Sequence, residues 1–347
     1  MTRTLRVAAL QLDSANGDVT GNLARARVHV AEAAAAGAQL VLLPELFAAG
    51  YSYDRSVAWA AAEPLPGGPT SAWLAEESRK HGIHLAATLL EATPAGHFHN
   101  TFVLYDSRGK LLCAVRKRPP AAAEAFLFQA GDAEQAGRVA FCPDLCGGTR
   151  VCVGICWECQ LAPLARHAAS KGAQLLLMPH CAPKVVGMPP SVSRGFARAV
   201  AALPNKYAAA FGVPVVFCNK SGPFVSPFLD APLLRWYRLD TQFLGGTVIV
   251  AAGGNTVAGP SYERNALIIG DVEVGPPASA ISPPVRRGLL SFARSSLVDD
   301  ERLFTPLTSL PAVLRILFAV VGLVGTCVYR IDVRRRRETA AARALGG

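Results

Sequence analysis

Three residues with chemically reactive side chains stand at the ends of short apolar runs: an acid, an amine and a thiol. They are Glu45, Lys117 and Cys156. A thiol becomes a nucleophile when a base removes its proton or when a nearby cation lowers its pKa. Glu45 is a candidate base, and the Lys117 ammonium is a candidate partner for both a thiolate and a developing oxyanion. This set predicts nucleophilic catalysis by Cys156, provided that the fold brings the three side chains together.

Buried strands are expected to position these residues, because ligands bind at the carboxyl ends of strands in α/β sheets. The apolar runs and the glycine-terminated helices predict two βαβ units, at 6–12, 22–36 and 40–43 and again at 151–155, 161–171 and 175–178. The stretch Gly-Ala-Gln-Leu-Val-Leu-Leu-Pro at 37–44 nearly repeats as Gly-Ala-Gln-Leu-Leu-Leu-Met-Pro at 172–179. This repeat predicts one α/β domain of two pseudo-symmetric halves.

The rest of the chain is expected to supply further strands and one long loop. The strands are predicted at 83–90, 100–105, 111–115, 213–218 and 247–252. Residues 221–243 are rich in proline and aromatic residues and lack periodicity, so they predict a long loop near the site.

The composition indicates a folded protein without a nucleic-acid partner. Of 347 residues, 51% are hydrophobic, which excludes a mainly disordered chain. The net charge is +10, and residues 330–347 supply +4 of it, from six Arg against Asp332 and Glu338. Elsewhere the basic residues do not cluster with aromatic ones, as a nucleic-acid groove requires. The nine cysteines lie mostly in apolar runs and no signal peptide is recognised, so a cytoplasmic catalytic domain with reduced thiols is expected.

Three stretches around the candidate residues resemble the nitrilase superfamily of carbon–nitrogen hydrolases. They are Leu-Leu-Pro-Glu45-Leu-Phe with Gly50-Tyr51, Arg-Lys117 with Glu124 and Gly131-Asp132, and Gly-Ile-Cys156-Trp157-Glu158. Asn100-Thr101 and the stretch 243–247 also agree. The resemblance covers residues 5 to 275, in the order of the family.

The resemblance implies a four-layer αββα sandwich with a Glu-Lys-Cys triad. Glu45 is then the general base, Lys117 stabilises the tetrahedral intermediate and Cys156 is the nucleophile. The implied supporting residues are Glu124, which orients the lysine and the substrate, and Trp157 and Tyr51, which bind the substrate or the oxyanion, Trp157 through its backbone N–H. The thiolate attacks a small-molecule nitrile or amide, ammonia or an amine leaves, and water hydrolyses the thioester. No metal or organic cofactor is implied.

The substrate and two alternative functions stay open at this point. Ala125 and the stretch Gly245-Gly246-Thr247 depart from the family pattern, so an amidase is as defensible as a nitrilase. The hydrophobic C-terminal segment suggests an N-acyltransferase-like member that is associated with a membrane. The spacing of Cys152, Cys156 and Cys159 also fits an iron–sulfur cluster of a radical enzyme, although two of these cysteines lie in a strand-like run.

The predicted domain organisation is a hydrolase domain followed by three C-terminal segments. The domain covers 1–276, and the segments are a Pro- and Arg-containing arm at 277–308, a hydrophobic helix at 309–331 and a basic tail at 332–347. The helix is near the lower limit for a membrane span and is flanked by arginines that attract anionic lipid. We expect membrane association through this helix, with a homo-oligomer contact as the alternative use of it. A homo-oligomer is expected in either case.

Overall fold

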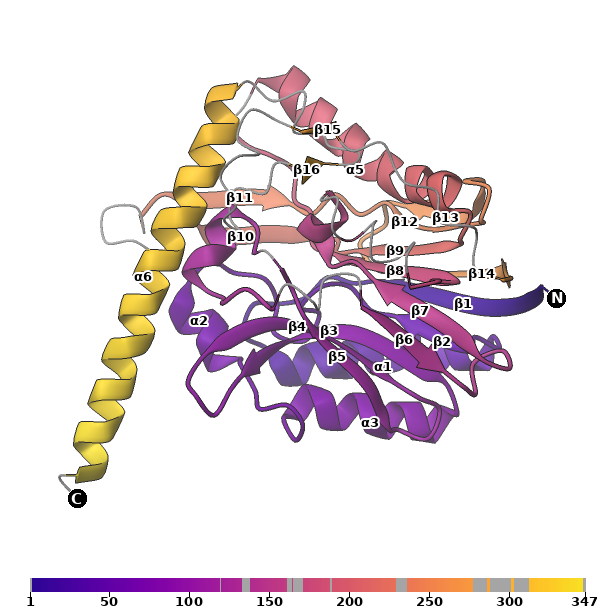
Figure 1. Cartoon of the computed structure of the whole chain (residues 1–347), viewed down its shortest axis with the longest axis horizontal. Helices are drawn as coiled ribbons and strands as arrows, with labels where there is room; N and C mark the ends of the chain where they lie inside the picture. The colour runs from indigo at the N-terminus through magenta and orange to yellow at the C-terminus, as the bar shows by residue number, and fades with distance from the viewer. Residues whose placement is uncertain are drawn as a thin grey trace.

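Two six-stranded β-sheets face each other in the computed structural model of this chain, with helices on their outer faces (Figure 1). The structure describes residues 2–118, 120–132, 138–160, 164, 171–187, 189–228, 236–276, 286–287, 301–302 and 312–345.

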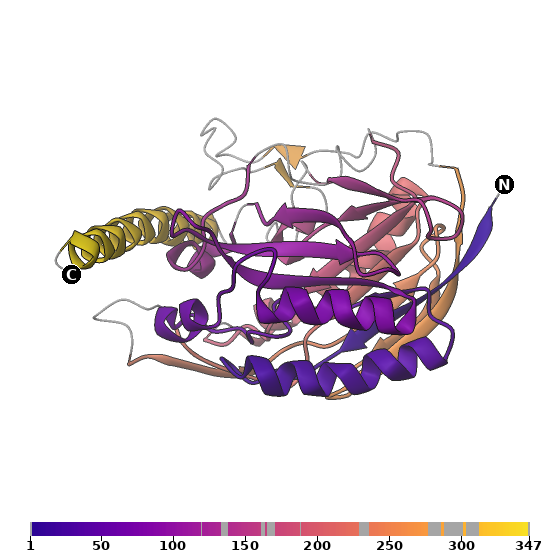
Figure 2. The same cartoon turned by 90° about the horizontal axis from the view of Figure 1, so that it is seen from below.

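The first sheet has the strand order β14-β1-β2-β3-β4-β5. Its strands are β1 (Arg3–Gln11), β2 (Leu40–Leu42), β3 (His84–Ala92), β4 (Phe98–Tyr105), β5 (Leu111–Arg116) and β14 (Ala266–Val274). The helices of this half are α1 (Val19–Ala35), α2 (Arg55–Ala60) and α3 (Pro69–His81). Helices α1 and α3 lie side by side on the outer face of the sheet (Figure 2).

The second sheet has the strand order β13-β12-β9-β8-β7-β6. Its strands are β6 (Val139–Cys142), β7 (Thr149–Val153), β8 (Leu175–His180), β9 (Val215–Asn219), β12 (Thr247–Val250) and β13 (Thr256–Ser261). Helix α5 (Pro190–Phe211) covers its outer face. The remaining elements are η1 (Ala122–Phe126), η3 (Cys156–Gln160), β10 (Pro223–Pro227), β11 (Arg238–Gln242), β15 (Arg286–Arg287), β16 (Glu301–Arg302) and α6 (Ala312–Leu345).

The two sheets have the same pattern of parallel and antiparallel strand pairing. In the first, β1, β2 and β3 are parallel neighbours, β4 and β5 continue antiparallel, and β14 pairs antiparallel with the other side of β1. In the second, β7, β8 and β9 are the parallel neighbours, β12 and β13 continue antiparallel, and β6 pairs with the other side of β7. This arrangement confirms the predicted αββα sandwich of two pseudo-symmetric halves.

Strand β1 shows why the buried strands read as continuous apolar runs. Leu5, Val7 and Ala9 belong to the core between the two sheets, whereas Ala8 and Leu10 belong to the core under α1 and α3. Successive side chains of a strand point to opposite faces of the sheet. Because both faces are covered here, no position of the strand's centre needs a polar residue.

Several elements differ from the sequence-based expectation. The stretch 221–243 is not one long loop, since β10 and β11 pair antiparallel within it; residues 229–235 lie outside the described residues. Helices α3 and α5 were not predicted. The predicted helix at 161–171 and the arm at 277–308 lie almost entirely outside the described residues.

Helix α6 is continuous over 312–345, so the predicted hydrophobic segment and basic tail share one helix. It packs against η1. At Gly325 the approach is so close that an added Cβ would lie 2.6 Å from the Phe126 ring and 3.0 Å from the backbone carbon of Ala125. One helical turn further, Tyr329 is buried, and its hydroxyl oxygen accepts a hydrogen bond of 2.9 Å from the backbone N–H of Phe98.

The predicted transmembrane helix over 309–331 is not supported. Within the parts of the chain that the structure describes, no helix is sufficiently long and apolar to cross a lipid bilayer. Tyr329 and Val333 of α6 are instead buried in an apolar cluster with residues of the hydrolase domain. The expected homo-oligomer stays a prediction.

Replacing Gly325 by Ala tests the contact between α6 and η1. Alanine is favoured over glycine in a helix interior by about 1 kcal/mol, so a free helix would gain stability. Here we expect the free energy of unfolding to fall by about 1–3 kcal/mol, because the methyl group overpacks the contact with Phe126. Urea denaturation measures it, with Leu323→Ala on the exposed side of α6 as the control. A variant as stable as the parent protein would show that α6 does not press on η1.

Candidate active site

The candidate catalytic residues come from strand ends of both sheets. Glu45 follows β2, Lys117 follows β5, and Cys156 begins η3, three residues after the end of β7. Two non-glycine residues here have left-handed backbone angles, Leu46 with φ of 49° and Cys156 with φ of 47°. Such angles are unfavourable for L-residues and persist where the surrounding structure imposes them, often at functional sites. The strand ends therefore present their side chains on sharply turned backbone.

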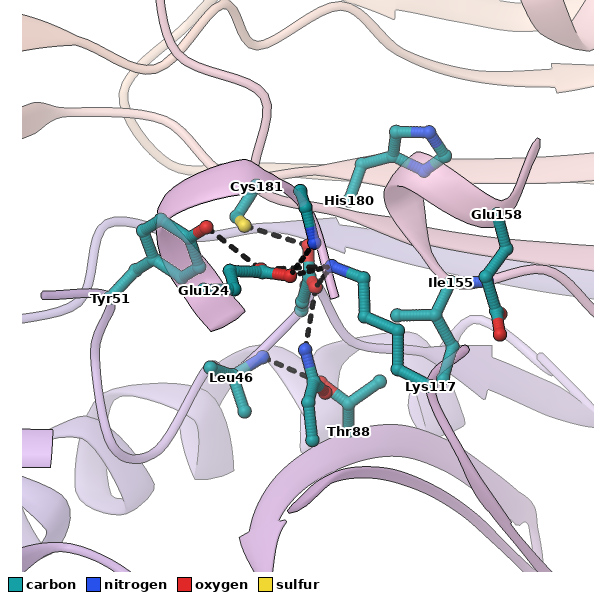
Figure 3. A network of polar contacts seen from close by, with 12 residues as sticks. Leu46, Tyr51, Thr88, Lys117, Glu124, Ile155, Glu158, His180 and Cys181 are labelled. Atoms are coloured by element: carbon teal, nitrogen blue, oxygen red, sulfur yellow. Dashed lines mark hydrogen bonds and ion pairs between the residues drawn. The ribbon is translucent and has the colours of Figure 1, made fainter. Parts of the chain in front are cut away.

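A buried ammonium group lies between two buried carboxylates. Lys117 Nζ is 2.7 Å from Glu45 Oε1 and 2.8 Å from Glu124 Oε2. All three residues have at most 3% of their surface exposed. Figure 3 shows the Lys117 side chain reaching from its strand end to the Glu124 carboxylate. The structure thus brings together three of the residues that the sequence singled out.

The two carboxylates differ in how firmly they hold a negative charge. Burial alone would raise the pKa of Glu45, but the Lys117 charge and hydrogen bonds outweigh it and lower that pKa. Burial raises the pKa of Glu124, with the Glu45 charge adding to the effect. Burial also opposes the charged form of Lys117, yet Glu124 and Glu45 together raise its pKa well above the ordinary value. Glu45 is therefore the carboxylate that holds its negative charge more firmly beside the Lys117 ammonium.

Glu45 is held at both of its oxygens. Its Oε1 accepts hydrogen bonds of 2.7 Å from Asn100 Nδ2 and from Lys117 Nζ. Its Oε2 accepts one of 2.7 Å from Cys181 Sγ. The Sγ of Cys156 lies within 4.8 Å of both the Glu45 carboxylate and the Cys181 sulfur. The candidate nucleophile consequently lies in the same cluster as the candidate base.

Glu124 is fixed by donors other than the lysine. The Tyr51 hydroxyl donates to Glu124 Oε1 at 2.8 Å, and the backbone N–H of Ala121 donates to Oε2 at 2.7 Å. Tyr51 is buried and points toward Glu124 in Figure 3. The hydroxyl of Tyr51 therefore contacts Glu124, the carboxylate that also binds Lys117. Trp157 lies in η3, half-buried, next to Cys156.

Glu158 connects the segment of Lys117 with that of Cys156. One of its oxygens accepts a hydrogen bond of 2.8 Å from the backbone N–H of Ile155, and the other accepts one of 2.5 Å from the backbone N–H of Arg118. Burial raises the pKa of Glu158 to about 7. Each bonded N–H belongs to a neighbour of a candidate catalytic residue, so this carboxyl group fixes the two backbones relative to each other.

Sequence reasoning missed Cys181 and gave no role to Glu158. Cys181 directly follows β8, as Cys156 follows β7 within three residues. The near-repeat of 37–44 at 172–179 places His180 in the position that corresponds to Glu45. Inspecting the residues behind the second copy of the repeat would therefore have pointed to His180 and Cys181.

The three cysteines proposed for an iron–sulfur cluster do not gather around one point. Cys152 and Cys159 are buried in the core under α5, while Cys156 packs against other clusters. Within the described ranges, the only group of three or more His, Cys, Asp or Glu donors placed to hold a metal is Glu45, Cys156 and Cys181. The cluster alternative has no support in this arrangement.

Comparison with known proteins agrees with the sequence pattern and the fold. The family model described as carbon–nitrogen hydrolase matches residues 6–276. Nitrilase 1 from Arabidopsis thaliana is 27% identical over 304 residues, which are 80% of this chain and 81% of that protein. An omega-amidase from Danio rerio is 33% identical over 187 residues, which are 50% of this chain and 62% of that protein.

Solved structures with a similar fold include two proteins whose chains are matched almost completely. An amidase from Nesterenkonia sp. superposes with a TM-score of 0.62 at 25% identity, covering 80% of this chain and 92% of that one. A carbon–nitrogen hydrolase from Helicobacter pylori G27 superposes with a TM-score of 0.67 at 20% identity, covering 78% and 89%. At 20% identity, the similarity to the Helicobacter pylori structure shows a shared fold alone.

Replacing Glu158 by Gln tests whether this residue holds the turn that carries Cys156. Both carboxylate oxygens accept from backbone N–H groups, so an amide must turn its NH₂ group toward one of those donors. We expect the free energy of unfolding to fall by about 1–3 kcal/mol, and turnover to fall by about 10-fold to 100-fold through misplacement of the thiol. Glu76→Gln on exposed α3 is the matched control. Unchanged turnover in Glu158→Gln would contradict this role.

The acid sensitivity of the fold should depend on His180. Burial lowers the pKa of His180 to about 4, below the ordinary value of 6.5 in an unfolded chain. Between these values the unfolded chain binds a proton that the folded chain does not, so the free energy of unfolding falls as the pH is lowered. His180→Gln should make this decline shallower by at most about 1.4 kcal/mol per pH unit. Denaturant titrations between pH 6.5 and 4 measure it, and a slope in His180→Gln equal to that of the parent would contradict this account.

Proposed function

This chain belongs to the carbon–nitrogen hydrolase family, and we propose that it hydrolyses a small nitrile or amide through a thioester on Cys156. The observation that carries this proposal is the buried Lys117 ammonium, fixed between Glu45 and Glu124 within the same network as the thiols. A positive charge held in this way, away from solvent, is suited to a reaction in which negative charge develops beside it.

The first half of the reaction forms the thioester. Glu45 takes the proton of Cys156, and the thiolate attacks the carbon of the amide or nitrile. With an amide, the carbonyl oxygen becomes an oxyanion, which Lys117 and the backbone N–H of Trp157 stabilise. Glu45 returns the proton to the departing nitrogen, the carbon–nitrogen bond breaks, and ammonia leaves. A nitrile first gives a thioimidate, and one water molecule converts this into the same thioester with release of ammonia.

The second half releases the acid. Glu45 removes a proton from a water molecule, which attacks the thioester carbon. The carbon–sulfur bond breaks, the acid leaves, and the proton returns to the Cys156 sulfur. Over the whole cycle an amide consumes one water and a nitrile two, and both yield one carboxylic acid and one ammonia.

Glu124 and Tyr51 act through the lysine in this proposal. Glu124 accepts hydrogen bonds from Lys117, Tyr51 and the backbone of Ala121, so it is anchored at both oxygens. This anchoring fixes the Lys117 Nζ in one position beside Glu45. Preorganised charges of this kind need no rearrangement when the transition state forms.

Replacing Cys156 by Ala should abolish turnover while leaving the fold intact. The covalent intermediate forms on this sulfur, so the rate should fall by at least about 10⁴-fold. Ammonia release measures the rate, and circular dichroism monitors the fold. Cys152→Ala, in the core under α5, is the control that should retain activity. If Cys156→Ala kept measurable turnover, the thioester route would be excluded.

The substrate class is tested with short aliphatic amides and the nitriles of equal carbon number. Ammonia and acid are measured in buffer that holds no amine acceptor. Acid and ammonia from either series support the hydrolase, and the faster series identifies the bond. Products that form only when an amine acceptor is added would instead indicate an acyltransferase.

A further inference from the structure

A second buried thiol lies inside the candidate active site. Cys181 has 2% of its surface exposed, and its Sγ donates to Glu45 Oε2 at 2.7 Å. In Figure 3 its sulfur points into the network, whereas the ring of the neighbouring His180 points away from it. The proposed reaction gives Cys181 no step, so its thiol is a nucleophilic group that the hydrolysis leaves unused.

The pairing of β7 and β8 explains why the two thiols meet. These strands are parallel neighbours with Val153 opposite Leu177. Cys156 stands three residues beyond the first of these, and Cys181 stands four residues beyond the second. Their sulfurs and a Glu45 oxygen lie within 4.8 Å of one another. Three separate strand ends therefore direct one donor atom each to a common point.

Two sulfurs and one carboxylate oxygen are a favourable donor set for a thiophilic cation. Zinc binds thiolates at about 2.3 Å and carboxylate oxygens at about 2.1 Å, which puts tetrahedral donors about 3.6–3.8 Å apart. The three donor atoms lie within 4.8 Å of one another, and the Cys181 sulfur, 2.7 Å from Glu45 Oε2, has to move outward to reach the tetrahedral spacing. Three protein donors leave the fourth position of the metal open.

We propose that Glu45, Cys156 and Cys181 form a binding site for a thiophilic divalent cation such as Zn²⁺. Both thiols lose their protons to solvent when the cation binds, and two S–Zn bonds and one O–Zn bond form. The two protons that leave offset the two charges of the cation, so the charges of Glu45, Glu124 and the Lys117 ammonium stay as they are without it. The bound cation occupies the lone pairs of the nucleophile and of the base, so it blocks hydrolysis reversibly. The inhibition rests on the proposed function, whereas the binding rests on the geometry alone.

Binding is tested on the full chain, reduced and freed of metal. Calorimetric titration with Zn²⁺ should give one site per chain. Cys181→Ser keeps a hydroxyl donor for Glu45 but removes the sulfur, and its affinity should fall by at least about tenfold, the lower end of what even an outer-shell change costs a metal site. Cys327→Ser, which removes an exposed thiol of α6, is the matched control and should bind like the parent. Equal zinc affinity in the parent and in Cys181→Ser would overturn the proposal.

The decisive outcome of a second measurement is read on the parent protein alone. Cd²⁺ bound to thiolates shows an ultraviolet charge-transfer band whose intensity grows with the number of sulfurs. The parent protein should show the intensity of two thiolates per bound ion, and Cys156→Ala should show one. A parent band of one thiolate, or none, would contradict the shared site.

Inhibition separates this proposal from the proposed function. Zn²⁺ should inhibit ammonia release in the parent, and Cys181→Ser should need at least about tenfold more zinc relative to its own zinc-free rate. Zinc binding in a protein whose Cys156→Ala variant still turns over would support the metal site and reject the proposed thioester route through Cys156. Turnover that depends on Cys156, in a protein that binds no zinc, would support the proposed function and overturn the metal site.

Discussion

The rest of the site depends on an ammonium group that is shared between two carboxylates away from water. Lys117 would lose much solvation energy on burial, and hydrogen bonds to Glu45 and Glu124 compensate for this loss. Removing one partner of such a buried group costs about 3–5 kcal/mol, because the other charge is left uncompensated. The ends of β2 and β5 and the segment η1 must therefore meet at one point for the domain to be stable. The arrangement of Lys117 between Glu45 and Glu124 that the proposed reaction uses is therefore also one that the stability of the fold requires.

Backbone turns at the strand ends orient the candidate catalytic side chains of the two sheets. Leu46 and Cys156 adopt left-handed backbone angles, which are unfavourable for residues other than glycine. The surrounding bonds compensate for this strain: the backbone N–H of Leu46 is held by the hydroxyl of Thr88, and Glu158 holds that of Ile155. The sheets hold the strand ends in place, and the strained turns determine where the side chains at these ends point.

The apolar runs and the internal repeat allowed the double βαβ architecture to be predicted, and the strand ends pointed to Glu45, Lys117 and Cys156, since these are local properties. The role of Glu124 and the meeting of the site residues were predicted from the family resemblance. Cys181 was missed because its significance lies in the register of β7 against β8, which a single run of residues does not contain. The pairing of β10 with β11 was missed because proline at both ends of β10 hides its alternation. The C-terminal helix was interpreted from its hydropathy, whereas Tyr329 and Val333 serve contacts within the chain.

Gly325 has a consequence for how this protein is handled. Through this residue α6 rests directly on η1, the short segment that carries Glu124. A displacement of α6 is therefore passed on to η1 and to the Glu124 carboxylate, which binds Lys117. An affinity tag, a reporter or a surface linker fused behind α6 is attached to the helix that contacts η1, whereas the same appendage before β1 lies on the opposite side of the domain from that helix (Figure 1).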